Sequence, residues 1–203
     1  MEMKDFLKKY VFEFDRLTSD LPKLSGGISR SEAFAFCALC RLYGIDLVID
    51  SGTGRGISSE YFARVLDFVI TIDNHIHYDD SLETSYSRLK HYDNILFIVG
   101  DSFRVIPFLL QTMKYERCAI FLDGPKGQNA FRLANELDII FAGFHDATPN
   151  TPDGTFFEEQ GLFLHTLDEW FLDEYSFLNR GKDRIKTQGY LNGAGTAFWY
   201  KNG

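Results

Sequence analysis

Short apolar runs alternate with amphipathic segments along most of the chain, and this alternation constrains the fold more than any other feature. Segments with apolar residues at helical spacing separate five runs of strand type. Such an order predicts crossover connections and a parallel sheet covered by helices on both faces. We therefore expect an α/β fold with a doubly wound, Rossmann-like sheet. The expected strands are Asp46–Asp50, Phe68–Asp73, Ile95–Asp101, Cys118–Gly124 and Ile139–Asp146.

The two ends of the chain add further helices and an antiparallel edge to this sheet. The sheet should then have about seven strands, mostly parallel, within a single domain. The expected flanking helices cover residues 2–17, a segment from Ser29 or Ser31 to about Tyr43, and Gly161–Glu174, and the expected edge strands are Tyr175–Arg180 and Gly195–Lys201. Residues 1–44 are the predicted N-terminal helices, 45–146 the cofactor-binding core and 147–203 the substrate-side and edge part.

Composition excludes several classes of function. The net charge of −8 argues against binding to nucleic acid or to an anionic membrane, because phosphate contacts need clustered Lys and Arg. The three cysteines do not form a disulfide framework, and the Cys37–Cys40 pair is interpreted as helix packing. No signal-type segment and no run long enough to span a bilayer is present. We expect a cytoplasmic protein, and a homodimer is compatible with the sequence.

Each of the five expected strands ends on or beside an aspartate. Ligands of open parallel sheets bind outside the carboxyl ends of the strands, so these carboxylates should gather at one rim. Negative charge concentrated there is costly unless a cationic or donor-rich ligand binds. The aspartates are Asp50, Asp73, Asp101, Asp123 and Asp146.

The loop after the first expected strand narrows the choice of ligand. Gly52, Gly54 and Gly56 form G-x-G-x-G, whereas a dinucleotide fingerprint needs a glycine where Ile57 stands. A phosphate loop of the Walker type needs a lysine that is absent here. An acid ahead of the loop, at Asp50, favours an amine or sulfonium, and the helix start favours a carboxylate. A ligand with an amino-acid group meets both demands.

In these features the sequence resembles the class I S-adenosylmethionine-dependent methyltransferases, whose first motif is similar to "DSGTGRG". The resemblance implies that Asp50 lies near the methionine amino group, that the glycine loop lines the cofactor and that Ser58 faces the carboxylate. It places Asp73 at the ribose hydroxyls, and Asp101 in "GDS" beside the adenine. The implied cofactor-binding residues are Ile28, Ser29, Asp50, Gly52, Thr53, Gly54, Gly56, Ser58, Asp73, Asn74, Asp101, Ser102 and Asp123.

A closer resemblance is to the small O-methyltransferases of the catechol and caffeoyl-CoA type. "SGGISRSEAF" is similar to their segment ahead of the first strand, and "FLDGPKG" to a motif with a metal-binding Asp and a basic Lys, here Asp123 and Lys126. "GFHDAT" is similar to their fifth-strand end, where an Asp and an Asn complete the metal set; Asp146 matches, but Ala147 replaces the Asn. The implied metal ligands are Asp123 and Asp146, and a divalent cation such as Mg²⁺ is left open.

The sequence therefore predicts methyl transfer from S-adenosylmethionine to a small-molecule nucleophile, with a hydroxyl oxygen as the expected acceptor. Lys126, His145 and Asp146 are the candidate catalytic residues; a buried Lys126 could act as a base, since desolvation lowers a lysine pKa. Two alternatives stay open: a cofactor-binding or interaction module without catalysis, and an aminopropyltransferase-like enzyme. Lys126 and His145 could also be ordinary loop and structural residues. His75 and His77 are interpreted as loop surface, and residues 151–163 as a lid or as edge packing.

Overall fold

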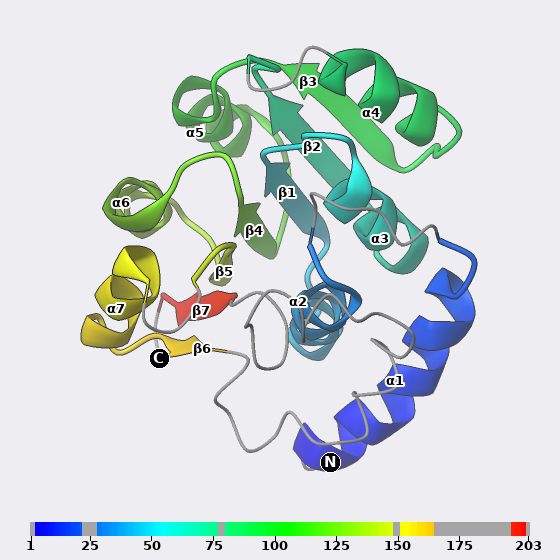
Figure 1. Ribbon diagram of the computed structural model, residues 1–203, viewed down its shortest axis with the longest axis horizontal. Coiled ribbons are helices and arrows are strands. Elements are labelled where there is room, and N and C mark those ends of the chain that lie inside the picture. Colours follow the sequence, from blue (N-terminus) through cyan, green and yellow to red (C-terminus); the bar gives the residue numbers. More distant parts are fainter. Residues whose placement is uncertain (1–2, 22–27, 77–79, 148–150, 165–195, 202–203) are drawn as a thin grey trace.

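The fold is a twisted sheet with helices on both of its faces (Figure 1). The computed structural model describes residues 3–21, 28–76, 80–147, 151–164 and 196–201. Across the sheet the strand order is β3-β2-β1-β4-β5-β7-β6. The strands are β1 (Leu47–Ser51), β2 (Val69–Asp73), β3 (Ile95–Val99), β4 (Cys118–Leu122), β5 (Phe141–Phe144), β6 (Phe163–Leu164) and β7 (Ala197–Tyr200). The helices are α1 (Met3–Thr18), α2 (Arg30–Leu42), α3 (Ile57–Val65), α4 (Ser81–Leu89), α5 (Ser102–Thr112), α6 (Gly127–Glu136) and α7 (Pro152–Glu159).

Strand direction confirms the doubly wound fold. Strands β1 to β5 pair in parallel, and β7 runs antiparallel to β5 and to β6. The strand order runs one way from β1 to β3 and the other way from β4 to β5, so it reverses beside β1, at its border with β4. Ligands bind at this point in folds of this kind. Six strands have four or five residues, whereas β6 has two and forms only an edge. The sheet therefore has six strands of ordinary length, and the predicted count of about seven is reached only with the two-residue edge strand β6.

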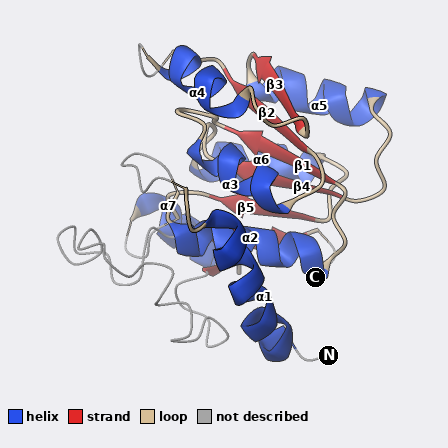
Figure 2. Ribbon diagram, turned by 90° about the vertical axis from the view of Figure 1, so that its right-hand side faces the viewer, coloured by secondary structure: helices blue, strands red, loops and turns tan. Residues whose placement is uncertain are grey.

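Alternating side chains divide the core between the two faces of the sheet. Along β4, Phe121 points to the face covered by α1, α2 and α3, while Ile120 and Leu122 point to the face covered by α5, α6 and α7. Phe36 of α2 packs against Phe121 with ring centroids 5.2 Å apart. Figure 1 shows the sheet between these two groups of helices, and Figure 2 shows the same fold turned by 90°. Aromatic rings thus make up much of the core on the face covered by α1, α2 and α3.

The C-terminal part differs from the sequence prediction. Residues 152–159 form helix α7, started by the Thr151 side chain, which accepts from the Gly154 amide. Phe157 is fully buried and stacks on Phe144 at 4.7 Å between centroids, so it belongs to the core and not to an exposed lid. The helix expected over Gly161–Glu174 is wrong at its start, because Phe163–Leu164 pairs with β7. The expected strand Tyr175–Arg180 lies outside the described residues. Among the described helices, none is long and apolar enough to cross a lipid bilayer.

Candidate active site

The glycine loop joins β1 to α3 at the carboxyl edge of the sheet, as predicted. Gly52 has φ of 102°, and a Cβ there would lie 2.4 Å from the Gly124 nitrogen, so the β1 and β4 loops touch through their backbones. Gly54 has φ of 49°, with nothing within 4 Å of the position of a Cβ. Only glycine suits position 52, whereas at Gly54 there is open space beside the loop.

Asp50 is buried directly beneath this loop. Its Oδ2 accepts from the Ser58 hydroxyl at 2.7 Å and from the Ser59 hydroxyl at 2.5 Å. Its Oδ1 is also buried but has no hydrogen-bond partner among the described residues. Burial raises the pKa of Asp50 to about 7, although the two serine hydrogen bonds oppose that rise. In this structure the Ser58 hydroxyl therefore supports Asp50, and the ligand carboxylate that the resemblance placed at Ser58 stays a prediction.

Asp73, at the end of β2, organises the neighbouring loops through backbone amides. Its Oδ2 accepts from the Gly54 amide at 2.7 Å, and its Oδ1 from the His75 amide at 2.6 Å. His75 has φ of 55°, bonds Ser81 through Nδ1 at 2.9 Å and stacks on Phe97. This histidine is more than the loop surface that the sequence suggested, whereas the expectation for His77 lies outside the described residues. Each Asp73 oxygen keeps a lone pair that could accept from a hydroxyl.

The other residues predicted near the cofactor have local partners at the same rim. Asp101 is exposed and caps α5 by accepting from the Phe103 amide at 2.8 Å. The Ser51 hydroxyl donates to Ser102 at 2.7 Å, which links β1 to the start of α5. Thr53 is buried, with its hydroxyl 2.5 Å from that of Thr71. Asn74 is exposed and accepts from the Ile76 amide, Ile28 packs in the core, and Ser29 is the N-cap of α2.

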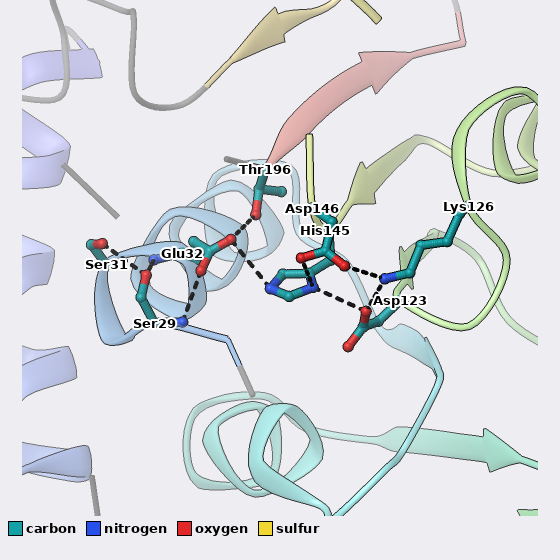
Figure 3. A network of polar contacts seen from close by, with 8 residues as sticks. All are labelled: Ser29, Ser31, Glu32, Asp123, Lys126, His145, Asp146 and Thr196. Atoms are coloured by element: carbon teal, nitrogen blue, oxygen red, sulfur yellow. Dashed lines mark hydrogen bonds and ion pairs between the residues drawn. The ribbon is translucent and has the colours of Figure 1, made fainter. Parts of the chain in front are cut away.

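A second polar cluster lies beside the first, at the ends of β4 and β5 (Figure 3). Lys126 Nζ contacts Asp123 Oδ1 and lies 2.6 Å from Asp146 Oδ2. His145 Nδ1 lies 2.9 Å from Asp123 Oδ1 and 3.3 Å from Asp146 Oδ1. The structure thus brings together the four residues that the sequence proposed for catalysis or metal binding.

A backbone turn allows adjacent residues to reach one cluster. Side chains of His145 and Asp146 would face opposite ways on an extended strand, but β5 ends at Phe144 and Asp146 has φ of 63°. This left-handed conformation is uncommon for a residue with a side chain, and it turns the Asp146 carboxylate back toward Lys126. The strained backbone at Asp146 therefore lets both His145 and Asp146 join the cluster.

The sequence prediction missed Glu32 and Thr196, which extend the cluster into the core. Glu32 is fully buried; its Oε2 accepts from the Ser29 amide at 2.8 Å and its Oε1 from the Thr196 hydroxyl at 2.7 Å. Oε1 also lies 3.6 Å from His145 Nε2. The signal for Glu32 was the S-x-x-E capping box that starts at Ser29. Nothing in the sequence pairs this glutamate with a histidine on β5, because that contact exists only in the folded sheet.

Electrostatics keep the residues of this cluster charged. Burial alone lowers the pKa of Lys126, but Asp123 and Asp146 outweigh it and raise the pKa overall. Burial alone also lowers the pKa of His145, whereas Glu32 and the two aspartates raise it well above its usual value. His145 and Lys126 in turn hold the pKa of Asp146 well below its usual range. In this arrangement Lys126 is a charged donor, contrary to the expectation that desolvation would make it a base.

A metal ion has partial support from these residues. Asp123, His145 and Asp146 offer ligand atoms that all lie within 4.8 Å of one another. The next position, where the resemblance called for an Asn, is Ala147, which is buried and has no donor atom. The predicted Asp123–Asp146 metal pair is therefore adjacent in space, but each carboxylate already has donors from Lys126 and His145.

Comparison with known proteins places this geometry in a known fold. No protein-family model matches the chain, and no curated protein matches it. Among solved structures, the O-methyltransferase TomG from Streptomyces achromogenes, in complex with S-adenosylmethionine, is 19% identical with a TM-score of 0.53, over 95% of this chain and 87% of that one. The Bacillus cereus O-methyltransferase, in complex with S-adenosylhomocysteine, is 18% identical with a TM-score of 0.53, over 79% and 82% of the two chains. The chain therefore has the fold of the class I S-adenosylmethionine-dependent methyltransferases and is structurally similar to their small O-methyltransferases.

Proposed function

We propose that the protein is an S-adenosylmethionine-dependent methyltransferase that acts on a small molecule, with a hydroxyl oxygen as the acceptor atom. The observation that carries the proposal is the buried Asp50 Oδ1, which lacks a partner among the described residues. A buried carboxylate oxygen without a donor is costly, and an ammonium group would supply that donor. The amino-acid part of S-adenosylmethionine has such an ammonium.

The surrounding residues fit the rest of this cofactor. The N-cap residue of helix α3 is Gly56, which has no side chain to cap the helix, so the amides of the first turn are suited to a ligand carboxylate. Asp73 would accept from the ribose hydroxyls and Asp101 from the adenine amine, since each already lies at the end of its strand and retains free lone pairs. These assignments follow the order of the strands and rest on the fold.

The cluster at the ends of β4 and β5 would receive the acceptor. When bound, S-adenosylmethionine supplies an electrophilic methyl group. Lys126 is 39% exposed and charged, so it can donate to an acceptor oxygen and hold it in one orientation. Orientation of the two reacting groups is itself a large part of the rate enhancement in such transfers. The hydroxyl proton would leave to water, because Asp146 is a weak base and Lys126 and His145 are already protonated.

A second candidate is a cofactor-binding module without turnover. It is favoured by the same electrostatics, since the charged Lys126 and His145 provide no free base near neutral pH among the described residues of the cluster. The two candidates share the cofactor site and differ only in the chemistry that follows binding.

Calorimetry with S-adenosylmethionine and S-adenosylhomocysteine tests the proposal. The wild-type protein should bind both, and Asp73→Ala should weaken binding at least tenfold, because two backbone anchors and the ribose acceptor are lost together. Asp67→Ala is the matched control, since Asp67 is exposed at the opposite end of β2. Absence of binding heat with the wild type at millimolar ligand would refute the proposal. Release of S-adenosylhomocysteine in the presence of a panel of hydroxylated small molecules separates the enzyme from the binding module.

A further inference from the structure

The Lys126 ammonium lies between two carboxylates that come from different strand ends. Its Nζ is 2.6 Å from Asp146 Oδ2 and also donates to Asp123 Oδ1 (Figure 3). His145 Nδ1 faces the same two carboxylates from the core side, at 2.9 and 3.3 Å. Donors from this chain therefore already meet both carboxylates.

The loop that carries Lys126 is held in place by ordered backbone. Lys126 is the N-cap residue of α6, three positions after Asp123, and Gly127 follows it with φ of 50°. A Cβ on Gly127 would lie 2.5 Å from Asp153 Oδ1, so α7 packs directly against this loop. The left-handed turn at Asp146 brings the second carboxylate to the same point. Three backbone segments therefore fix the position of the ammonium: the loop that carries Lys126, helix α7 and the turn at Asp146.

A divalent cation fits this arrangement poorly. Mg²⁺ prefers six oxygen ligands, whereas the chain offers two carboxylates, and Ala147 brings no third oxygen. A cation held by Asp123 and Asp146 would also stand beside the Lys126 ammonium, and like charges at contact distance repel strongly. The donor set therefore suits one side-chain ammonium better than it suits a metal.

We propose that Lys126 is the resident cation of this site, occupying the place between Asp123 and Asp146 where the resemblance left a divalent metal open. The protein then binds its ligands without a metal, and the carboxylate pair becomes a divalent-cation site only when the Lys126 charge is removed. This half of the proposal depends on the described contacts alone and holds whether or not methyl transfer follows.

The resident ammonium also defines the class of acceptor, and this second half rests on the proposed function. A lysine ammonium has three N–H donors, of which Asp123 and Asp146 use two. One donor remains for an acceptor, and the 39% exposure of Lys126 makes it reachable. The acceptor is therefore held through one oxygen, as in a compound with a single hydroxyl group. A metal would instead chelate two neighbouring hydroxyls. Without a metal, the second hydroxyl of a catechol-type acceptor should add no affinity at this site.

Titration of the protein with Mn²⁺ alone, followed by the electron paramagnetic resonance of the free ion, tests the first half. The wild type and Lys126→Arg should bind no Mn²⁺ at millimolar concentration, because the positive charge stays in place. Lys126→Met should gain a site with at least tenfold higher affinity than the wild type, since the two neighbouring carboxylates lose the ammonium that lies between them and keep only His145 on the core side. Lys114→Met, at an exposed lysine just after the C-terminal end of α5, is the control and should gain none.

Micromolar Mn²⁺ binding by the wild type would overturn the proposal, and this measurement needs no variant to fold. A Lys126→Met protein with a cooperative thermal transition that still binds no Mn²⁺ would overturn it as well. For the second half, phenol-type and catechol-type acceptors that differ by one hydroxyl should show similar KM values, unchanged by a chelator. A chelator-sensitive preference of tenfold or more for the catechol would refute it. Failure of cofactor binding in calorimetry, by contrast, would count only against the proposed function.

Discussion

Replacement of Asp50 by asparagine tests the electrostatics beneath the glycine loop. Asp50 is fully buried, and its pKa of about 7 lies far above the ordinary value of 3.8 because burial disfavours the charged form. Asparagine has the same shape as the protonated aspartic acid and can still accept from the Ser58 and Ser59 hydroxyls through its oxygen. The substitution therefore removes the cost of ionisation while keeping most of the packing.

The expected magnitude follows from proton linkage. Between pH 3.8 and about 7 the folded protein holds a proton on Asp50 that the unfolded chain has lost, so the free energy of unfolding falls as pH rises through this window. At about 1.4 kcal/mol for each tenfold difference in proton affinity, the full loss in the wild type is about 4 kcal/mol. Between about pH 5 and about pH 8, about 2.5 kcal/mol of it should be lost in the wild type and none of it in Asp50→Asn. The buried amide N–H of the variant costs about 1–3 kcal/mol at every pH and cancels in this comparison.

Urea denaturation of both proteins without ligand, followed by circular dichroism, measures the effect. The stability difference between Asp50→Asn and the wild type should change by about 2.5 kcal/mol in favour of the variant from about pH 5 to about pH 8. Asp67→Asn, at an exposed site, is the control for the loss of one surface charge. If the stability difference is the same at both pH values, Asp50 does not titrate as the structure indicates and the reasoning fails. Saturating S-adenosylhomocysteine should then stabilise the wild type but not the variant, because the ammonium partner of Asp50 is lost.

Three further predictions follow from the packing of the site. Gly52→Ala should destabilise the protein by more than about 3 kcal/mol and abolish cofactor binding, because the new Cβ would lie 2.4 Å from a backbone atom. The control is Gly44→Ala, which has φ of 60° but nothing within 4 Å of a Cβ, and it should cost only about 1–2 kcal/mol in the same urea assay. Phe157→Ala should cost about 3–5 kcal/mol if α7 packs as described, whereas the 71%-exposed Phe12 should tolerate alanine, and equal effects would restore the lid interpretation. Glu32→Gln should keep the Thr196 hydrogen bond and lower the pKa of the His145 imidazole, measured by NMR. Glu32→Ala should lose the hydrogen bond and lower that pKa as well, and an unchanged imidazole pKa in both variants would exclude the contact.

Local sequence signals were sufficient for the elements that position the site. The apolar runs predicted β1 to β5 within two residues at each end, because a doubly covered parallel strand must be apolar throughout. The glycine loop between the first strand and its helix was also confirmed, as was an N-cap at Ser29, one of the two candidates, since both depend on backbone demands within a few residues. The conditional prediction that His145 and Asp146 need a turn to share a site was met by the left-handed Asp146.

Contacts between distant segments could not be predicted in the same way. The resemblance implied that Ser58 faces a ligand carboxylate, but no local signal shows that its hydroxyl donates to Asp50, a contact decided by how α3 lies over β1. A buried Lys126 was considered as a base, but two carboxylates from separate strands outweigh desolvation and raise its pKa. For Phe157 the sequence left a lid and edge packing both open, and the apolar surface that decides for packing exists only in the folded sheet. In each case tertiary packing decides what a local signal leaves open.

The aspartates at the strand ends differ in which groups of the chain compensate their negative charge. This difference identifies where a cationic ligand is needed. Asp73 accepts from the amides of Gly54 and His75, and Asp101 accepts from the amide of Phe103, so both already have donors from the backbone. Asp123 and Asp146 face Lys126 and His145, which supply opposite charge from the chain itself. Burial raises the pKa of Asp50, and its Oδ1 is buried without a partner in the described part of the chain. A cation offered from solution therefore gains most at Asp50, and that argues for an amine-bearing ligand over the glycine loop and against a metal at the β4 and β5 ends.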